Sequence, residues 1–378
     1  MEGPRGCKKE ERTGVIKLIN RIFRESEGHH STMGEQFPLL LSEKNLNNMR
    51  IIVEDGKPVA AVNFYTSNLL LEGTSIKAAS VGAVCTDQEY QGRGYSSLLL
   101  DDAEKIMKQD GVDIMLVSGG RSLYLRRGCR RGGRCYEAKI KAQNLAGQAV
   151  EMGSFRDEDI RKMAFLYSTD STRYYRSFYE FKMLLNGGMV PWGNYNYKAY
   201  LIKQRSETVG YVVLRGMNNE SRYMDVVEFA GNREAVYQGL KEIAYQNSLR
   251  YVKFRCGFQD EMYHIIKREN LEYEETYLQG TIKIINFVSF MEKLRTYFHQ
   301  YVEKETVDQM IFKEADGTWS FIMGEERVEI SDRKTLIQLI FGDKTEVLPD
   351  MQDNPSIKKF ITCVFPIPFV MTDNLNFQ

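Results

Sequence analysis

A turn that contains two glycines, Gln91-Gly92-Arg93-Gly94-Tyr95-Ser96, joins an apolar stretch (AASVGAVCT) to an amphipathic one (SSLLLDDAEKIMKQDG). Glycine tolerates positive φ, and a turn between a strand and a helix directs backbone N–H groups and the positive end of the helix to one point, where a phosphate can bind. The dinucleotide fingerprint needs a third glycine where Ser97 stands, and the P-loop needs Gly-Lys followed by Ser or Thr, so neither motif applies. On spacing alone, an ordinary glycine-rich connection remains an alternative.

The wider stretch VGAVCTDQEYQGRGYSSLLLDDAEK resembles motif A of the GCN5-related N-acetyltransferases (GNAT), whose pattern is [QR]xxGx[GA]. Gln91 and Gly94 match, and Ser96 stands where the family has glycine or alanine. The resemblance implies that the loop amides hold the pyrophosphate of acetyl-CoA. It also implies that the preceding strand diverges from its neighbour and pairs with the pantetheine amides. The cofactor-binding residues expected from it are Val84, Cys85, Thr86, Gln91, Gly92, Arg93, Gly94, Tyr95, Ser96, Ser97, Gly119 and Gly120.

Local patterns predict the elements that must position this turn. The segment TGVIKLINRIF has apolar residues at helical spacing, and MRIIVEDGKPVAAVNFY reads as a hairpin around Asp55-Gly56. Further on, SDRKTLIQLIFG reads as a capped helix that ends at Gly342. Residues 146–278 repeat the order helix, hairpin, strand, loop, helix and strand, but their loop, AGNREAV, lacks the QxxG pattern. Any α/β segment can show this order, so the repetition alone is a weak signal.

The whole layout is similar to that of the Eis-like (enhanced intracellular survival) family. That resemblance implies a GNAT acetyltransferase domain at 1–145 and a degenerate second GNAT-like domain at 146–278. It also implies a sterol-carrier-like domain with a C-terminal arm at 279–378. The predicted fold class is therefore α+β, with tandem GNAT-like mixed-sheet domains followed by a C-terminal α+β domain.

Acetyl transfer to an amine needs a base for the amine and an acid for the departing thiolate. The segment SGGRSLYLRRGC resembles the family's Y-x-R-x-G segment, with Tyr124, Arg126 and Gly128 matching, which implies Tyr124 as the acid. A phenol with an unperturbed pKa near ~10 is protonated at neutral pH and can donate. The alternative is that Tyr124, one of 22 tyrosines, simply packs.

The base is less apparent, because the strand AASVGAVCT lacks the glutamate that many superfamily members use. In Eis-like enzymes the base is the C-terminal carboxylate, which here would belong to Gln378. The chain ends FPIPFVMTDNLNFQ, and its prolines favour an extended arm that is able to return to the first domain. A tail that only docks is an equal alternative.

The acceptor side is suggested by the segment ESEGHHSTMGEQFPLL, which lies where superfamily members contact their acceptor. His29, His30 and Glu35 are candidates for binding a cationic amine, with a solvated loop as the ordinary alternative. Trp192, in VPWGNYNYKAY, is a candidate for an aromatic wall against a cation, with hairpin packing as its alternative.

Six arginines lie between Arg121 and Arg134, around three glycines. They are suited to an anion, such as the 3′-phosphate of CoA or an acidic acceptor, and arginine-rich segments of this kind also bind RNA backbones. A solvated turn with local salt bridges is the default interpretation. The neutral total, 51 basic against 51 acidic residues, argues against nucleic acid or a membrane surface as the main partner.

Length and composition exclude other classes. The chain of 378 residues has no apolar run long enough to span a membrane, and its charged start lacks the apolar segment of a secretory signal. Its six dispersed cysteines form no CxxC pair, so we expect reduced thiols in a cytoplasmic protein. Four histidines without an HExxH motif suggest no metal site.

The sequence thus predicts a cytoplasmic enzyme that transfers acetyl from acetyl-CoA directly to a primary amine of a small molecule or peptide. Three alternatives remain: a non-catalytic acyl-CoA-binding sensor or scaffold, a transferase of longer acyl or aminoacyl groups, and an RNA-binding module that uses the Arg121–Arg134 cluster. The sequence does not identify the acceptor or decide whether the protein forms a homo-oligomer.

Overall fold

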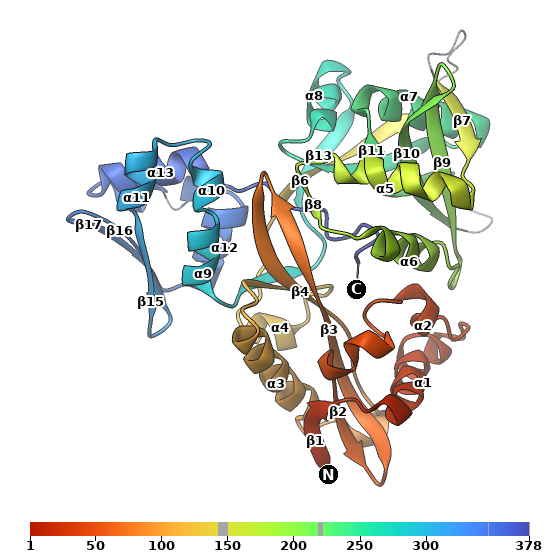
Figure 1. The fold of residues 1–378 in the computed structure, drawn as a ribbon, viewed down its shortest axis with the longest axis horizontal. Coiled ribbons are helices and arrows are strands. Elements are labelled where there is room, and N and C mark those ends of the chain that lie inside the picture. Colours follow the sequence, from red (N-terminus) through yellow and green to blue (C-terminus); the bar gives the residue numbers. More distant parts are fainter. Residues whose placement is uncertain (143–149, 218–221, 347, 378) are drawn as a thin grey trace.

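The computed structural model describes residues 1–142, 150–217, 222–346 and 348–377, which form two seven-stranded sheets and one three-stranded sheet (Figure 1). Helices cover both large sheets, so the fold is the predicted α+β class with tandem mixed-sheet units. None of the helices in these residues combines the length and hydropathy needed to cross a membrane. The six cysteines are free thiols, and no cluster of metal-ligating side chains occurs among the described residues.

The first sheet has the order β1-β2-β3-β4-β5-β14, with β8 paired to β3. Only β4 and β5 run parallel; the other pairs are antiparallel. The predicted hairpin at Asp55-Gly56 is present, and both residues have positive φ, as a type I′ turn requires. The strands are β1 (Glu2–Gly6), β2 (Met49–Glu54), β3 (Lys57–Leu71), β4 (Thr74–Thr86), β5 (Ile114–Val117), β8 (Thr172–Tyr174) and β14 (Thr281–Ile284).

Two groups of helices cover opposite faces of this sheet, because successive side chains of a strand point to opposite sides. In β2, Ile51 and Val53 pack with the apolar face of α1, whereas Ile52 packs with α3. One face carries α1 (Arg12–Phe23) and α2 (Met33–Gln36), and the other carries α3 (Tyr95–Gln109) and α4 (Ser122–Arg126).

The second sheet, β13-β6-β12-β11-β10-β9-β7, repeats this construction. In β10, Val212 and Leu214 pack with α7, whereas Tyr211 and Val213 pack with α5 and α6. The strands are β6 (Arg134–Lys141), β7 (Glu151–Ser154), β9 (Tyr195–Gln204), β10 (Glu207–Met217), β11 (Tyr223–Gly231), β12 (Tyr251–Gly257) and β13 (Glu272–Tyr277). The helices are α5 (Ile160–Ser168), α6 (Phe178–Gly188), α7 (Arg233–Gln246) and α8 (Glu261–Arg268).

The third part packs five helices against the small sheet and against the tip of the β3–β4 hairpin, where Leu69, Leu71 and Ile76 join its core (Figure 1). The predicted helix α12 is present, and the Asp332 carboxylate accepts from the Thr335 N–H at 2.7 Å as its cap. The strands are β15 (Ile311–Ala315), β16 (Thr318–Met323) and β17 (Glu326–Ile330). The helices are α9 (Phe287–Lys293), α10 (Arg295–Phe298), α11 (Lys304–Gln309), α12 (Arg333–Phe341) and α13 (Pro355–Val364).

The three predicted segments exchange strands. β6, at the end of 1–145, belongs to the second sheet, whereas β8 from 146–278 and β14 from 279–378 belong to the first. The predicted domain boundaries near residues 145 and 278 therefore stay a prediction. Each of the two large sheets contains strands from more than one of the three predicted segments.

A C-terminal arm, residues 366–377, runs without helix or strand from the third part into the space between the two large sheets (Figure 1). Thr372 donates its hydroxyl to the Gln279 carbonyl at 2.8 Å, and Asp373 accepts from Arg255 at 2.9 Å. Leu375 shares a core with Leu39 of the first part and with apolar side chains of α5 and α6. The arm therefore touches all three parts of the molecule.

A buried ion pair holds the end of this arm. Arg176 and Glu228 are 2% and 3% exposed and form two hydrogen bonds, of 3.0 and 2.7 Å. The same guanidinium donates to Asn376 of the arm at 2.6 Å and lies 3.9 Å over the ring of Tyr167. Removing one charge would leave the other buried without compensation.

We expect Glu228→Gln to lower the free energy of unfolding by roughly 3–5 kcal/mol, because it leaves a buried, uncompensated guanidinium. Urea unfolding measures the change. Arg156→Gln is the control: its pair with Glu158 is 79% and 71% exposed, so a change within about 0.5 kcal/mol is expected. Equal effects of the two substitutions would contradict the structural role of the buried pair.

Candidate functional site

The parallel ladder between β4 and β5 ends early. β4 pairs with β5 only from Ala78 to Val81, and β5 stops at Val117, while β4 continues to Thr86. The backbone of residues 82–86 is paired to β3 on one side and not to β5 on the other. Because backbone N–H and C=O groups need partners, this edge is suited to an extended ligand that carries amides.

An irregularity in the backbone marks the same place. The β3–β4 register shifts between Ala61 and Asn63, and Ala83 of β4 takes a positive φ of 49°. The buried Asn63 amide donates to the Ala83 carbonyl at 3.1 Å, but its own oxygen finds no donor among the described residues. Such strain is common where a strand is shaped for function.

The glycine turn lies directly after this edge. Gly92 and Gly94 have φ of 76° and 77°, so the turn requires glycine for its conformation, and a Cβ at either position would meet no atom within 4 Å. Among the described residues, the backbone N–H groups of Gly92, Arg93 and Gly94 have no acceptor. Gly94 caps α3 without a side-chain hydrogen bond, so the positive end of the helix is left without a side-chain acceptor.

The other residues of the turn have distinct contacts. Ser96, the departure from the family pattern, shares a 2.9 Å hydrogen bond with Thr86 through its hydroxyl, which ties the end of β4 to the start of α3. Tyr95 is buried and donates to Glu54 at 2.5 Å. Gln91 and Arg93 are exposed, Arg93 lies 4.7 Å over the ring of Tyr90, and Ser97 accepts from Arg127 through its carbonyl at 2.7 Å.

Tyr124 lies in α4, just past the end of β5, and is 7% exposed. A Cβ at Gly119 would lie 3.5 Å from its ring, an ordinary van der Waals contact, so Gly119 lies directly beside the phenol. Burial raises the pKa of Tyr124 above its usual value of 10, against the opposing charge of Arg121, while Cys129 and Cys85 act in the same direction as burial. The phenol is thus held protonated at neutral pH beside the diverging strands.

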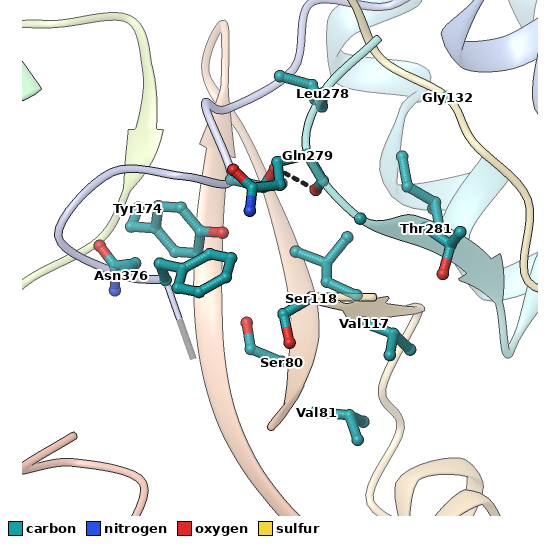
Figure 2. Close-up of a pocket in the computed structure, with 15 residues that line it drawn as sticks. Ser80, Val81, Val117, Ser118, Gly132, Tyr174, Leu278, Gln279, Thr281 and Asn376 are labelled. Atoms are coloured by element: carbon teal, nitrogen blue, oxygen red, sulfur yellow. Dashed lines mark hydrogen bonds between the residues drawn. The ribbon is translucent and has the colours of Figure 1, made fainter. Parts of the chain in front are cut away.

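A small cavity of about 20 Å³ lies beside the last paired residues of the β4–β5 ladder (Figure 2). Ser80, Val81, Val117 and Ser118 form its strand side, and the arm closes it with Thr372, Asn376 and Phe377. Ser118 and Phe377 also line a larger neighbour, so the two spaces share walls.

The larger space, which we call the central pocket, has a volume of about 280 Å³ and lies between the first and second sheets. Ala83 and Ser118 place one end of it at the diverging strands, on the face of the sheet opposite α3. Its lining residues are Phe23, Arg24, Met33, Gln36, Phe37, Leu40, Ala83, Ser118, Gly187, Gly188, Trp192, Tyr197, Arg215, Val227, Gln279, Asp373, Asn374, Leu375 and Phe377.

The predicted acceptor residues are only partly brought together. Trp192 lines the central pocket, and its ring lies 6.3 Å, edge to face, from that of His29. His29, His30 and Glu35 do not line the pocket, and the last two are exposed. Gln378, the residue predicted to supply the base, lies outside the described residues.

The arginine cluster is divided between structural and free side chains. Arg127 binds Asp101 at 2.6 Å, Arg130 donates to the carbonyls of Leu125 and Cys129, and Arg134 pairs with Glu275. Arg121, Arg126 and Arg131 are exposed and form no ion pair among the described residues. Half of the cluster therefore has the local partners that the default interpretation expects.

Several pocket residues could not be identified from the sequence. Arg24, Ser118 and Gln279 come from three different segments and share no motif. The three residues become neighbours only when these distant segments pack together. A local sequence pattern therefore cannot indicate that they share a pocket.

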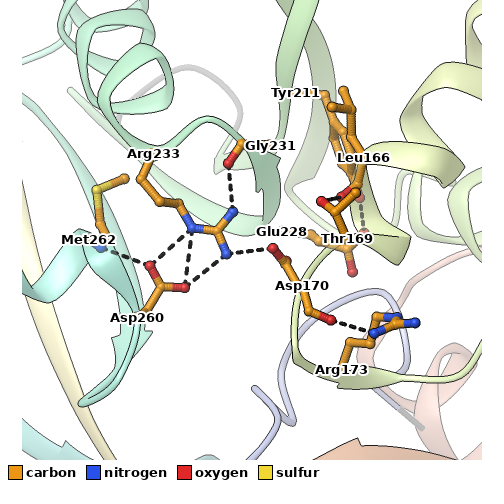
Figure 3. A network of polar contacts seen from close by, with 10 residues as sticks. All are labelled: Leu166, Thr169, Asp170, Arg173, Tyr211, Glu228, Gly231, Arg233, Asp260 and Met262. Atoms are coloured by element: carbon orange, nitrogen blue, oxygen red, sulfur yellow. Dashed lines mark hydrogen bonds and ion pairs between the residues drawn. The ribbon is translucent and has the colours of Figure 1, made fainter. Parts of the chain in front are cut away.

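The corresponding loop of the second sheet is built differently. Asn232 caps α7 with its own side chain, which accepts from the Ala235 N–H at 2.8 Å. Behind it, Arg233 donates to Asp170 at 2.8 Å and to Asp260 at 3.0 Å (Figure 3). The helix N-terminus that would receive a phosphate is thus satisfied within the chain, which gives a physical reason for the degenerate loop.

This network has a pH dependence. Burial raises the pKa of Asp170 to about 6, although Arg233 acts in the opposite direction. Between about pH 4 and 6 the folded state keeps a proton that an unfolded Asp, with a pKa of about 3.9, has released. Protonated Asp170 therefore stabilises the folded state below about pH 4, and this stabilisation is lost as the pH rises through 6.

We expect the difference in unfolding free energy between the native chain and Asp170→Asn to fall with rising pH, by on the order of 2–3 kcal/mol from pH 4 to 7. Urea unfolding at a series of pH values measures it. Parallel pH profiles for the two proteins would show that Asp170 does not titrate in this way.

Comparisons with known proteins agree with this geometry. Residues 4–132 match the model of the acetyltransferase (GNAT) domain. Among solved structures, the chain is similar to a GCN5-related N-acetyltransferase from Anabaena variabilis, with 14% identity, a TM-score of 0.69, and coverage of 97% of this chain and 98% of that one. No curated protein matches the chain.

Two further structures show the same fold over nearly the full length. A GCN5-related N-acetyltransferase from Kribbella flavida has 13% identity and a TM-score of 0.63, and covers 97% of this chain and 98% of its own. Eis1 from Mycobacterium abscessus has 12% identity and a TM-score of 0.64, and covers 98% of this chain and 100% of its own. At this identity the likeness establishes the fold, and the match to the GNAT domain model covers residues 4–132 of this chain.

Proposed function

We propose that this protein transfers an acetyl group from acetyl-CoA to a primary amine, with Tyr124 as the general acid. The observation that carries the proposal is the divergence of β4 from β5 directly before a glycine turn with unpaired N–H groups. The match of residues 4–132 to the GNAT domain supports it.

The residues present fit acetyl-CoA in two respects. The unpaired edge of residues 82–86 offers backbone groups to the pantetheine amides, and the N–H groups of Gly92, Arg93 and Gly94 offer donors to the pyrophosphate. Ser96 retains the small size that the motif needs.

In the proposed reaction, the amine nitrogen forms a bond to the thioester carbonyl carbon, and the bond between that carbon and sulfur breaks. Tyr124 donates its phenolic proton to the departing thiolate, and the amine loses a proton to a base. For that base we keep the α-carboxylate of Gln378; the support is that Phe377, the preceding residue, lines the central pocket.

The Eis-like assignment, a sterol-carrier-like role for the third part and a cytoplasmic location belong to the same proposal. The three-part layout and the full-length likeness to Eis1 from Mycobacterium abscessus support the first two, and the six free cysteines support the third. A non-catalytic acyl-CoA sensor would bind the same ligand but release no thiol with any amine. Comparing turnover of acetyl-CoA with turnover of long-chain acyl-CoA distinguishes acetyl transfer from transfer of a longer acyl group.

We expect Gly94→Val to abolish stabilisation by acetyl-CoA, because it strains the turn and places a side chain where the N–H groups converge. For the native chain, ligand at a hundred times Kd adds about 2.7 kcal/mol of stability, seen as a higher Tm. Gly111→Val is the matched control: Gly111 also has positive φ, 67°, with open surroundings, at the other end of the same helix. The cofactor assignment would be overturned if acetyl-CoA raised the Tm of neither the native chain nor the Gly111→Val control.

We expect Tyr124→Phe to keep the affinity for acetyl-CoA but to lower turnover by roughly 10²–10⁴-fold, since it removes the donated proton. In the native chain, activity should not decline through loss of this proton until the pH exceeds 10, because burial raises the pKa of Tyr124. Thiol release and isothermal titration separate the two effects. Tyr297→Phe, in the core of the third part, serves as the control, and equal turnover in both variants would remove the acid role.

A further inference from the structure

The charged side chains of the central pocket are mostly basic. Arg24 and Arg215 line it from the first and second parts of the chain. The only acidic side chain among the described lining residues is that of Asp373, and Arg255 already binds it at 2.9 Å. Among the described lining residues, basic side chains therefore outnumber acidic ones.

Arg24 is 7% exposed and has no carboxylate within ion-pair distance in the described part of the chain. Its guanidinium donates to Thr32, to the Phe23 carbonyl and to Gln36, at 3.3, 2.8 and 2.6 Å. A guanidinium has five N–H groups, so one on each terminal nitrogen remains without an acceptor among these residues. Burial lowers the pKa of Arg24, as expected for a cation without a counter-ion.

Trp192 fixes the orientation of this guanidinium. The central carbon of the Arg24 guanidinium lies 4.4 Å from the centre of the Trp192 ring, and the indole N–H donates to Tyr197 at 3.1 Å. Gln36, which holds one side of the guanidinium, also donates to the Val190 carbonyl at 3.3 Å. The arginine is therefore held between the first and second parts, and its planar face cannot turn away from the pocket freely.

Arg215 gives an independent indication. Its Nε–H is buried and finds no acceptor among the described residues, and its contact with Asp225 is long, at 3.4 Å. Its guanidinium lies 5.2 Å over the ring of Tyr195. Two arginines, one directly after α1 and one in β10, thus keep donors without an acceptor among the described residues at one pocket, which is typical of a site for an anionic group.

The rest of the pocket is small, and its lining mixes apolar side chains with polar ones such as Gln279 and Asn374. Phe37, Leu40 and Leu375 are among the side chains that line it, and its volume of about 280 Å³ lies near the low end of ligand sites, roughly 300–1,000 Å³. The pocket reaches from Ala83 and Ser118, at the diverging strands, to the arginines. An acceptor the size of an amino acid can place its amine at the first end and an anion at the other.

We propose that the acceptor is an amine that also carries a carboxylate and an apolar side chain, in the size range of an amino acid or short peptide, and that Arg24 binds the carboxylate. This inference rests on the proposed acetyl transfer at the same site. Arg24, which has no carboxylate partner among the described residues, disfavours a second cationic group at its end of the pocket through like-charge repulsion. This proposal therefore replaces the expectation that His29, His30 and Glu35 bind a cationic amine.

The test uses pairs of acceptors that differ only in the anionic group: phenylalanine against phenethylamine, and phenylalaninamide as the neutral isostere. For the full chain, we expect kcat/KM for phenylalanine to exceed that for both partners by roughly 10–100-fold, the range of one or two charge-assisted hydrogen bonds. Spermine, a polyamine, should be the poorest acceptor. A native chain that prefers phenethylamine or spermine overturns the inference.

Arg24→Gln should remove the preference, lowering kcat/KM for phenylalanine by a factor roughly 10–100 times larger than its effect on kcat/KM for phenethylamine, and Arg24→Lys should restore part of the preference. Arg156→Gln, at an exposed site, is the control. If Arg24→Gln fails to fold, the preference of the native chain still decides. If phenethylamine but not phenylalanine supports thiol release, the proposed function stands and this inference is overturned. If acetyl-CoA does not raise the Tm of the native chain, the proposed function itself is overturned.

Discussion

The structure depends on one interrupted pairing. β4 leaves β5 after Val81, and the backbone beyond that residue has only one partner strand. A polar backbone edge at the middle of a sheet is costly unless something binds it, so the surrounding elements are arranged around the opening. On one face lie the glycine turn, α3 and Tyr124, and on the other lies the central pocket.

The opening is completed by segments that are far apart in the sequence. The arm supplies Phe377 and Leu375, the second part supplies Trp192 and Arg215, and the first supplies Arg24. These parts are held together by buried polar contacts such as that of Arg176 with Glu228 and Asn376. Since buried pairs lose much when one partner leaves, the arm and the two sheets form one structural unit around the pocket.

How much of this could be predicted from the sequence follows from the range of each interaction. The Asp55-Gly56 hairpin, the turn before α3 and the cap of α12 are local, and their residue types determine them. The assignment of β6, β8 and β14 to sheets depends on pairings across more than one part of the chain, which no local period records. α13, which follows the predicted helix α12, has no counterpart among the elements that the sequence patterns predict.

The candidate site divides in the same way. The turn and Tyr124 were identified through motifs, and the structure places both beside the diverging strands. No motif identifies Arg24, because its local sequence is that of an ordinary charged helix terminus. Only the approach of Trp192, from a distant segment, distinguishes it. His30 and Glu35 were chosen for their polarity, but they lie exposed outside the pocket.

The position of β14 has a consequence for how the chain is made. β14 pairs antiparallel with β5 through Thr281–Ile284, so the first sheet stays incomplete until that segment has left the ribosome. Domains generally fold as units as they emerge, N-terminal first. Here the first sheet instead waits for more than half of the chain, with the edge of β5 exposed meanwhile, and such an edge is a template for pairing with other chains. This topology therefore leaves the edge of β5 without its β14 partner for most of the time in which the chain is made.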